Sequence, residues 1–386
     1  MEPFEIVAGG GIEDFVTVRH LRASGTNREI GRTLATAARA VHGPLAGPHA
    51  VPDPVVQRAR MQWFERNAPV LAERILGAGD AFGVDASRAD VDVAWLSTYG
   101  VPAGCSVVFY PGAGTKDGHG VLSRNFDFPN VSYTQLFGMP PLPDERPMAA
   151  DPWLVELHPE DGYASLTLAI MDVMGAMDGV NEAGLAVALL ADNESPNQEP
   201  SVVPQVGLSE QQIVRHLLDS CATVDEAKQA LLMAKQYYFF VPCHFVVSDR
   251  NGDAFVWEYS PGHNVERIVE GTAETAGRMV CTNHLLHRRP DPFDLPTDTG
   301  IDGTAAMTYS RWTALAAAVG EGSIVDRDDI RDQFRSVRFE APVPMARTFW
   351  HALWDVDDAS VEVSFFVRDE DDVSQYTEPL RFGLSR

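Results

Sequence analysis

The sequence predicts an α+β protein in which antiparallel β-sheets are covered by helices. Short β-prone runs are joined by tight turns, and helical stretches are grouped between sets of strands instead of alternating strictly with them. Apolar residues make up 45% and charged residues 22% of the 386 residues. These fractions are typical of soluble globular proteins, so a disordered chain and a small disulfide scaffold are excluded.

The first hundred residues are predicted to be mostly helical. Thr26 or Asn27 is expected to cap a helix in which apolar residues recur at one-turn multiples. A second helix is expected from about Asp53 to Gly77, where glycines would end it.

The pattern changes after Tyr99, where β-prone runs begin. Residues 105–110 and 120–128 are expected to form a hairpin around a Pro-Gly turn. Further strands are expected over residues 164–171, 184–190, 244–247, 254–259, 279–282 and 361–367.

Three helices are expected among these strands. Capping boxes at residues 209–212 and 223–226 would open two of them, with the second ending near Lys235. The third is expected over residues 310–319, with Ser310 as its N-cap.

The charge balance restricts the classes of partner. A net charge of −25 argues against nucleic acid and against anionic membrane surfaces, since both would repel the protein. No secretory signal and no apolar run of about 20 residues is visible, so we expect a cytoplasmic protein without membrane contact. A small-molecule substrate is expected, and a homodimer is left open.

The four cysteines do not form a metal or redox motif. Cys105, Cys221, Cys243 and Cys281 lie far apart in the sequence, with no C-x-x-C pair. We therefore expect reduced cysteines and no metal.

The most informative stretch places Cys105 directly after Gly104. Glycine leaves its peptide carbonyl uncrowded, so the thiol could attack that carbonyl. The predicted hairpin would bring Arg124 and Asp127 close to Cys105. A neighbouring arginine favours a thiolate, and an aspartate could hold an ammonium group or orient a base. A packing cysteine with a surface arginine and aspartate remains an open alternative on these residues alone.

A second group follows the predicted strand at residues 279–282. Asn283 could donate its side-chain amide to a developing oxyanion, and His284 could act as a base. Plain turn residues would explain both equally well. Arg311, at the start of the last predicted helix, is explained by capping when it is considered alone.

Taken together, these segments resemble cysteine N-terminal-nucleophile (Ntn) hydrolases. The resemblance is to the isopenicillin-N acyltransferase-like family of acyl-CoA:6-aminopenicillanic acid acyltransferases and linear amide C–N hydrolases, which is related to choloylglycine hydrolases and penicillin V acylases. The matching segments follow the family's order and are residues 104–105, 124–127, 181–187, 244–249, 282–284 and 309–312.

The resemblance implies a four-layer αββα sandwich, with two antiparallel sheets between helices. Residues 1–104 would be a helical N-terminal pro-segment that packs on the same domain, and residues 105–386 would be the catalytic part. Self-cleavage between Gly104 and Cys105 would separate the two. The spacing from Cys105 to Asp127 is longer than the family pattern, so we expect an insertion within residues 111–118.

The resemblance also implies roles for individual residues. Cys105 would be the nucleophile, with its freed α-amino group as the base, while Asp127 would hold that group in its ammonium form. Arg124 would position the thiol and amine, Asn283 would stabilise the oxyanion, and Arg311 would support the site. Further candidates for oxyanion or substrate contact are Asn193 and His284.

The implied function is hydrolysis of a small N-acyl or aminoacyl amide, or transfer of its acyl group, through a Cys105 acyl-enzyme. No cofactor is expected, although acyl-CoA could serve as a co-substrate. One alternative is an uncleaved cysteine amidase or thioesterase that uses His119 or His284 as its base. Another is a non-catalytic binding module on the same fold.

Overall fold

The computed structural model describes most of the chain. The described residues are 4–94, 104–136, 140, 142, 145–171, 173–192, 194, 203–239, 242–260, 265–271, 278–289, 291, 294–299, 307–318, 323–340 and 346–384.

A nine-stranded sheet crosses the molecule in the order β1-β2-β7-β8-β9-β10-β11-β12-β13. Its neighbouring strands are antiparallel, except that β2 and β7 run parallel. The strands are β1 (Phe4–Gly9), β2 (Thr17–Gly25), β7 (Pro152–Pro159), β8 (Ser165–Ile170), β9 (Asp178–Asn181), β10 (Leu185–Ala191), β11 (Cys243–Asp249), β12 (Ala254–Ser260) and β13 (Val265–Glu270).

A seven-stranded antiparallel sheet faces it, in the order β14-β5-β6-β15-β16-β17, with β18 also paired to β16. The strands are β5 (Cys105–Tyr110), β6 (Val121–Pro129), β14 (Met279–Cys281), β15 (Ala346–Asp355), β16 (Ser360–Glu370), β17 (Val373–Tyr376) and β18 (Leu380–Gly383). A separate short pair joins β3 (His49–Ala50) to β4 (Val91–Asp92).

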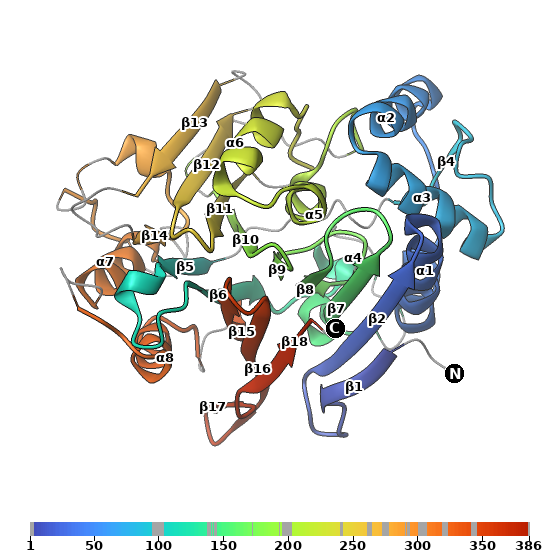
Figure 1. Cartoon of the computed structure of the whole chain (residues 1–386). Helices are drawn as coiled ribbons and strands as arrows, with labels where there is room; N and C mark the ends of the chain where they lie inside the picture. The colour runs from blue at the N-terminus through green and yellow to red at the C-terminus, as the bar shows by residue number, and fades with distance from the viewer. Residues whose placement is uncertain are drawn as a thin grey trace.

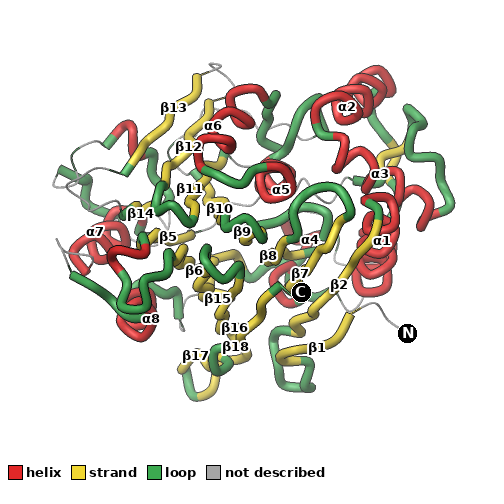
Figure 2. Tube along the Cα trace, viewed as in Figure 1, coloured by secondary structure: helices red, strands yellow, loops and turns green. Residues whose placement is uncertain are grey.

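Helices cover the outer faces of both sheets (Figure 2). On the nine-stranded sheet lie α5 (Glu210–Ser220) and α6 (Val224–Met233), while α7 (Thr308–Ala318) and α8 (Arg327–Arg335) pack against the seven-stranded sheet. The short α4 (Tyr133–Leu136) follows β6. The predicted αββα arrangement of two sheets between helices is therefore confirmed.

Local sequence signals explain several of these boundaries. The side chain of Thr26 caps α1 (Asn27–His42), and Gln212 accepts a hydrogen bond from the Ser209 backbone at the start of α5, as predicted. Thr223 caps α6, which ends at Met233, slightly before the predicted end. The hairpin of β5 and β6 also forms as predicted, with Cys105 opposite Phe126.

Three expectations about the helices and the N-terminal part need correction. The single helix expected from Asp53 to Gly77 is broken into α2 (Pro54–Asn67) and α3 (Pro69–Phe82), because Pro69 cannot continue the hydrogen-bond ladder. The mostly helical N-terminal part also contributes β1 and β2 to the large sheet. Ser310 is not an N-cap, because α7 begins at Thr308; instead, its hydroxyl donates to Asp298.

The N-terminal part shares its core with the rest of the chain. Figure 1 shows α1, α2 and α3 gathered at one side of the molecule, with β2 lying along β7. Arg74 of α3 is fully buried and donates to both carboxylate oxygens of Asp219 in α5, at 2.7 and 3.0 Å. Its Nε also donates to Asn27 at 3.0 Å. A buried ion pair therefore joins the two parts.

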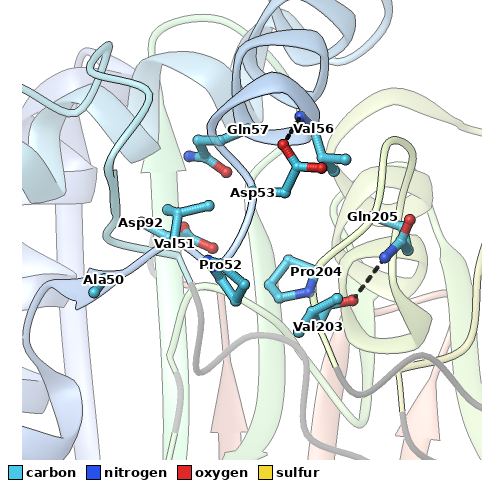
Figure 3. A pocket seen from close by; sticks show the side chains of 10 residues that line it. All are labelled: Ala50, Val51, Pro52, Asp53, Val56, Gln57, Asp92, Val203, Pro204 and Gln205. Atoms are coloured by element: carbon cyan, nitrogen blue, oxygen red, sulfur yellow. Dashed lines mark hydrogen bonds between the residues drawn. The ribbon is translucent and has the colours of Figure 1, made fainter.

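A small cavity of about 140 Å³ lies where the N-terminal part meets residues 203–205. Figure 3 shows residues 50–53 on one side and residues 203–205 on the other. None of the predicted catalytic residues lines it.

Within the described residues, no helix has the length and apolar character that a membrane crossing would need.

We expect Asp219→Asn to destabilise the protein by about 3–5 kcal/mol, because the fully buried Arg74 would lose its counter-charge. Urea unfolding measures this change. The matched control is Asp90→Asn, which removes the exposed partner of Arg88 and should leave the midpoint unchanged. Equal effects of the two substitutions would show that the buried pair does not join the two parts.

Candidate active site

The Gly104–Cys105 peptide is held on both sides. The backbone N–H of Cys105 donates to Oδ1 of Asn283 at 2.8 Å. The carbonyl oxygen of Gly104 accepts from the backbone N–H of Asp127 at 3.0 Å. Cys105 is the first residue of β5 and is buried between β6 and β14. The peptide bond is therefore fixed at the start of a central strand.

Arg124 extends from β6 toward the sulfur and the facing sheet. Its Nη2 donates to Sγ of Cys105 at 3.4 Å and to the carbonyl of Leu189 at 2.6 Å. Its Nη1 donates to the carbonyl of Met177 at 2.7 Å. The ring of Phe126 lies 5.0 Å from the guanidinium carbon. These contacts fix the guanidinium against the thiol.

Asp127 is a fully buried carboxylate next to the same peptide. Oδ1 accepts from the hydroxyl of Thr348 at 2.5 Å, and Oδ2 lies 3.5 Å from Nη1 of Arg311. Among the described residues, Oδ2 accepts no hydrogen bond. Burial raises the pKa of Asp127 to about 6, although Arg311 opposes the shift.

Arg311 connects the other groups of the site. From the first turn of α7, its Nη1 donates to the carbonyl of Cys105 and to Oγ of Ser106, both at 2.7 Å. Its Nη2 donates to Oδ1 of Asn283 at 2.6 Å. Arg311 thus contacts both the backbone of Cys105 and the side chain of Asn283, and its predicted supporting role stays a prediction.

Asn283 presents its oxygen, not its amide group, to Cys105. Its Nδ2 donates to the carbonyl of Ala191 at 2.8 Å, and its backbone N–H donates to Thr308. The side chain therefore holds the Cys105 nitrogen in place. Its predicted role as an oxyanion donor stays a prediction.

The surroundings of Cys105 shift the pKa of its thiol in opposite directions. Burial raises its pKa, while the charge and hydrogen bond of Arg124 lower it. Most cysteine enzymes remove the thiol proton with a neighbouring histidine. In the described part of the chain, no histidine contacts Cys105.

The two candidate histidine bases lie elsewhere. His284 is buried among the hydroxyls of Thr282 and Thr308, and burial lowers its pKa to about 4. His119 lies at the tip of the β5–β6 hairpin, 2.9 Å from the Asp355 carboxylate. Asn193, the other candidate, lies outside the described residues.

Sequence reasoning missed two side chains of the site, one that donates to Asp127 and one that lies against Arg124. Thr348 on β15 donates to Asp127, which lies on the neighbouring strand β6. Asp178 on β9 lies with its Oδ1 3.2 Å from Nη1 of Arg124. The signal for Asp178 was a single acidic residue within the apolar stretch of residues 173–180.

One group of described side chains could in principle surround a metal ion. His119, Asp355 and Asp357 place ligand atoms within 4.8 Å of one another. Arg327 also donates to Asp355, so a cation already pairs with this carboxylate. The group is not part of the contacts around Cys105.

Comparison with known solved structures finds similar folds at low sequence identity. A mutant of conjugated bile acid hydrolase from Clostridium perfringens matches with a TM-score of 0.44 and 14% identity, over 73% of this chain and 97% of that one. Penicillin V acylase from Agrobacterium tumefaciens matches with a TM-score of 0.42 and 18% identity, over 68% and 82%.

Sequence comparison finds a curated relative and a family. Penicillin V acylase of Pectobacterium atrosepticum is 31% identical over 160 residues, which are 38% of this chain and 42% of the relative. The chain thus matches less than half the length of that relative. Residues 114–296 match the model of the family described as acyl-coenzyme A:6-aminopenicillanic acid acyl-transferase. The resemblance predicted from the sequence is therefore confirmed for residues 114–296, which carry Arg124, Asp127 and Asn283.

Proposed function

We propose that the protein is a self-processing cysteine enzyme that cleaves a small N-acyl or aminoacyl amide, or transfers its acyl group, through a Cys105 acyl-enzyme. The observation that supports this most strongly is the convergence of Arg124, Asp127, Asn283 and Arg311 on one Gly–Cys peptide. The similarity to penicillin V acylase and to the acyl-transferase family supports the same chemistry.

The first reaction is an attack of the Cys105 sulfur on the carbonyl carbon of Gly104. The negative charge that develops on the Gly104 oxygen is stabilised by the Asp127 backbone N–H, which already donates to that oxygen. The C–N bond then breaks, the nitrogen takes up the proton of the thiol, and a thioester remains. Water hydrolyses the thioester, releasing the Gly104 carboxylate and restoring the thiol.

Cleavage would also free the α-amino group of Cys105, which gives the site a new base. A free α-amino group has a pKa of about 7.7–8.0, so it can accept the thiol proton near neutral pH. Asn283 Oδ1, which accepts from the Cys105 nitrogen, would keep the amine in place. The Oδ2 of Asp127 would accept a hydrogen bond from its ammonium form. Thiol and amine together need no metal or cofactor.

The cleaved enzyme would then turn over an external amide. The thiolate attacks the substrate carbonyl, the leaving amine takes a proton from the α-ammonium group, and an acyl-enzyme forms. Water resolves this thioester in a hydrolase, and an amine resolves it in an acyl-transferase. In the transferase, acyl-CoA would donate the acyl group by thioester exchange with Cys105.

We expect the wild-type chain to separate on denaturing electrophoresis into fragments of 104 and 282 residues, because Cys105 would cleave its own peptide bond. Cys105→Ala should stay whole and inactive, while Cys221→Ala, which changes another buried cysteine, should be cleaved normally. The two fragments should elute together under native conditions. A fully active chain that remains whole would refute self-processing.

We expect the ionisation of Asp127 to cost stability in the uncleaved protein. Its folded pKa of about 6 lies above its ordinary value of 3.8, so the folded state binds the proton more tightly than the unfolded state. The stability that this proton provides is present at low pH and is lost as the pH rises through about 6. Asp127 is faced by Arg311, Arg124 and Arg338, whose charges oppose the shift.

Urea unfolding of Cys105→Ala, with and without Asp127→Asn, measures this cost. Between pH 3 and pH 7 the protein with Asp127 should lose about 3 kcal/mol relative to the asparagine variant, with most of the loss between pH 4 and pH 6, and the difference should stay constant above pH 7. A constant difference from pH 4 upward would show that the folded pKa is not raised.

We expect the 282-residue fragment to gain the mass of an acyl group after incubation with the right member of a panel of N-acyl amides and acyl-CoA thioesters. Intact mass spectrometry measures the gain and identifies the acyl group. Hydroxylamine, which cleaves thioesters, should reverse it. An acyl group that persists after this treatment, or that also attaches to Cys105→Ala, would contradict an acyl-enzyme on Cys105.

A further inference from the structure

The facing sheet contributes a carboxylate that the proposed reaction does not use. Asp178, the first residue of β9, is fully buried, with Oδ1 3.2 Å from Nη1 of Arg124. Its Oδ2 accepts from the indole N–H groups of Trp350 and Trp354, at 3.4 and 3.2 Å. Asp178 thus connects the two sheets through the same arginine that contacts the Cys105 sulfur.

The contacts of Asp178 favour its ionised form. Burial raises the pKa of Asp178, and the charge of Arg124 opposes that shift. Among the described residues, Oδ2 accepts from two N–H groups, whereas Oδ1 makes the ion pair with Arg124 but no hydrogen bond. A protonated carboxyl would need an acceptor for its own proton. A carboxylate therefore satisfies these contacts better than a carboxylic acid does.

Arg124 needs such a counter-charge. Its side chain is completely buried, and an isolated buried guanidinium would carry a large desolvation cost. Asp178 makes the largest electrostatic contribution that raises the pKa of Arg124, ahead of Cys105 and Asp127.

We propose that Asp178 is a positioning residue whose carboxylate offsets the charge of Arg124, so that the guanidinium orients the Cys105 thiol without holding it permanently as a thiolate. The inference rests on the proposed role of Cys105 as nucleophile. The negative charge of Asp178 would serve the reaction, because a thiolate becomes a weaker nucleophile as the pKa of its thiol falls. Without Asp178, the charge of Arg124 would lower the pKa of the Cys105 thiol. The thiolate would then be more abundant but less nucleophilic.

The surroundings of the thiol allow the effect of Asp178 to be isolated. Among the described residues, the charged and titratable groups around Cys105 include Arg124 and Asp127 of β6, Arg311 of α7 and Cys243 of β11. The carbonyls of Met177 and Leu189 also hold Arg124. Asp178→Asn should therefore remove charge while the guanidinium stays in place.

The test is the pH dependence of iodoacetamide alkylation in Asp178→Asn, with labelled peptides separated by mass spectrometry. This separation distinguishes Cys105 from the other three cysteines, and cleaved from uncleaved chains. We expect the pH midpoint for alkylation of Cys105 to fall by about one pH unit or more. The reason is that the charge of Asp178 would no longer offset that of Arg124, which lowers the pKa of the thiol. The matched control is Asp219→Asn, which removes the counter-charge of another buried arginine, Arg74, but should not move the alkylation midpoint of Cys105.

Trp354→Phe provides a second variant that keeps an aromatic ring in the core. It removes one of the two donors to Asp178, so the carboxylate is stabilised less and the midpoint should fall by a smaller amount. If Asp178→Asn does not fold, this variant tests whether Asp178 affects the Cys105 thiol.

An unchanged midpoint in the folded variants, or an equal shift in Asp219→Asn, would overturn the role of Asp178. The role would also be overturned if iodoacetamide alkylated Cys105 at no pH, since Arg124 would then not act on a reactive thiol. Failure of the proposed function shows differently, as a wild-type chain that neither cleaves itself nor turns over an amide.

Discussion

The burial of charge beside Cys105 is the constraint on which this structure depends. Two guanidinium groups, Arg124 and Arg311, lie in the interior next to one peptide bond. Each needs a carboxylate and several oxygen acceptors, because an unpaired buried cation would cost more than the fold can supply. Asp178 and Asp127 provide the carboxylates, and the backbone carbonyls of Met177, Leu189 and Cys105 are among the acceptors. The packing of the two sheets and the geometry at the sulfur are thus set by the same contacts.

Local patterns in the sequence were sufficient for the hairpin that carries the site. Residues 105–110 and 121–129 have apolar runs on either side of a Pro-Gly turn, so pairing them is a short-range problem. This pairing places Arg124 and Asp127 near Cys105. The caps at Thr26 and Thr223 are equally local, since each hydroxyl acts on a backbone group only three residues away.

Long-range pairing explains what the sequence did not reveal. The strand β2 pairs with β7, more than a hundred residues later, and nothing in residues 17–25 indicates that partner. Asp178 pairs with Arg124 because two sheets face each other, and Thr348 reaches Asp127 because β15 lies beside β6. The family resemblance supplied the roles expected for Asn283 and Arg311, because the residues alone left plain turn and capping roles open.

The parallel pairing of β2 with β7 also affects how the protein can be produced. A chain that began at Cys105 would lack β1 and β2, leaving one long side of β7 with unsatisfied backbone N–H and C=O groups. Such a strand is a template for pairing with other molecules, and β7 is rich in apolar residues. Recombinant expression of residues 105–386 alone would thus favour insoluble aggregates, whereas co-synthesis with residues 1–104 would shield that strand from the start.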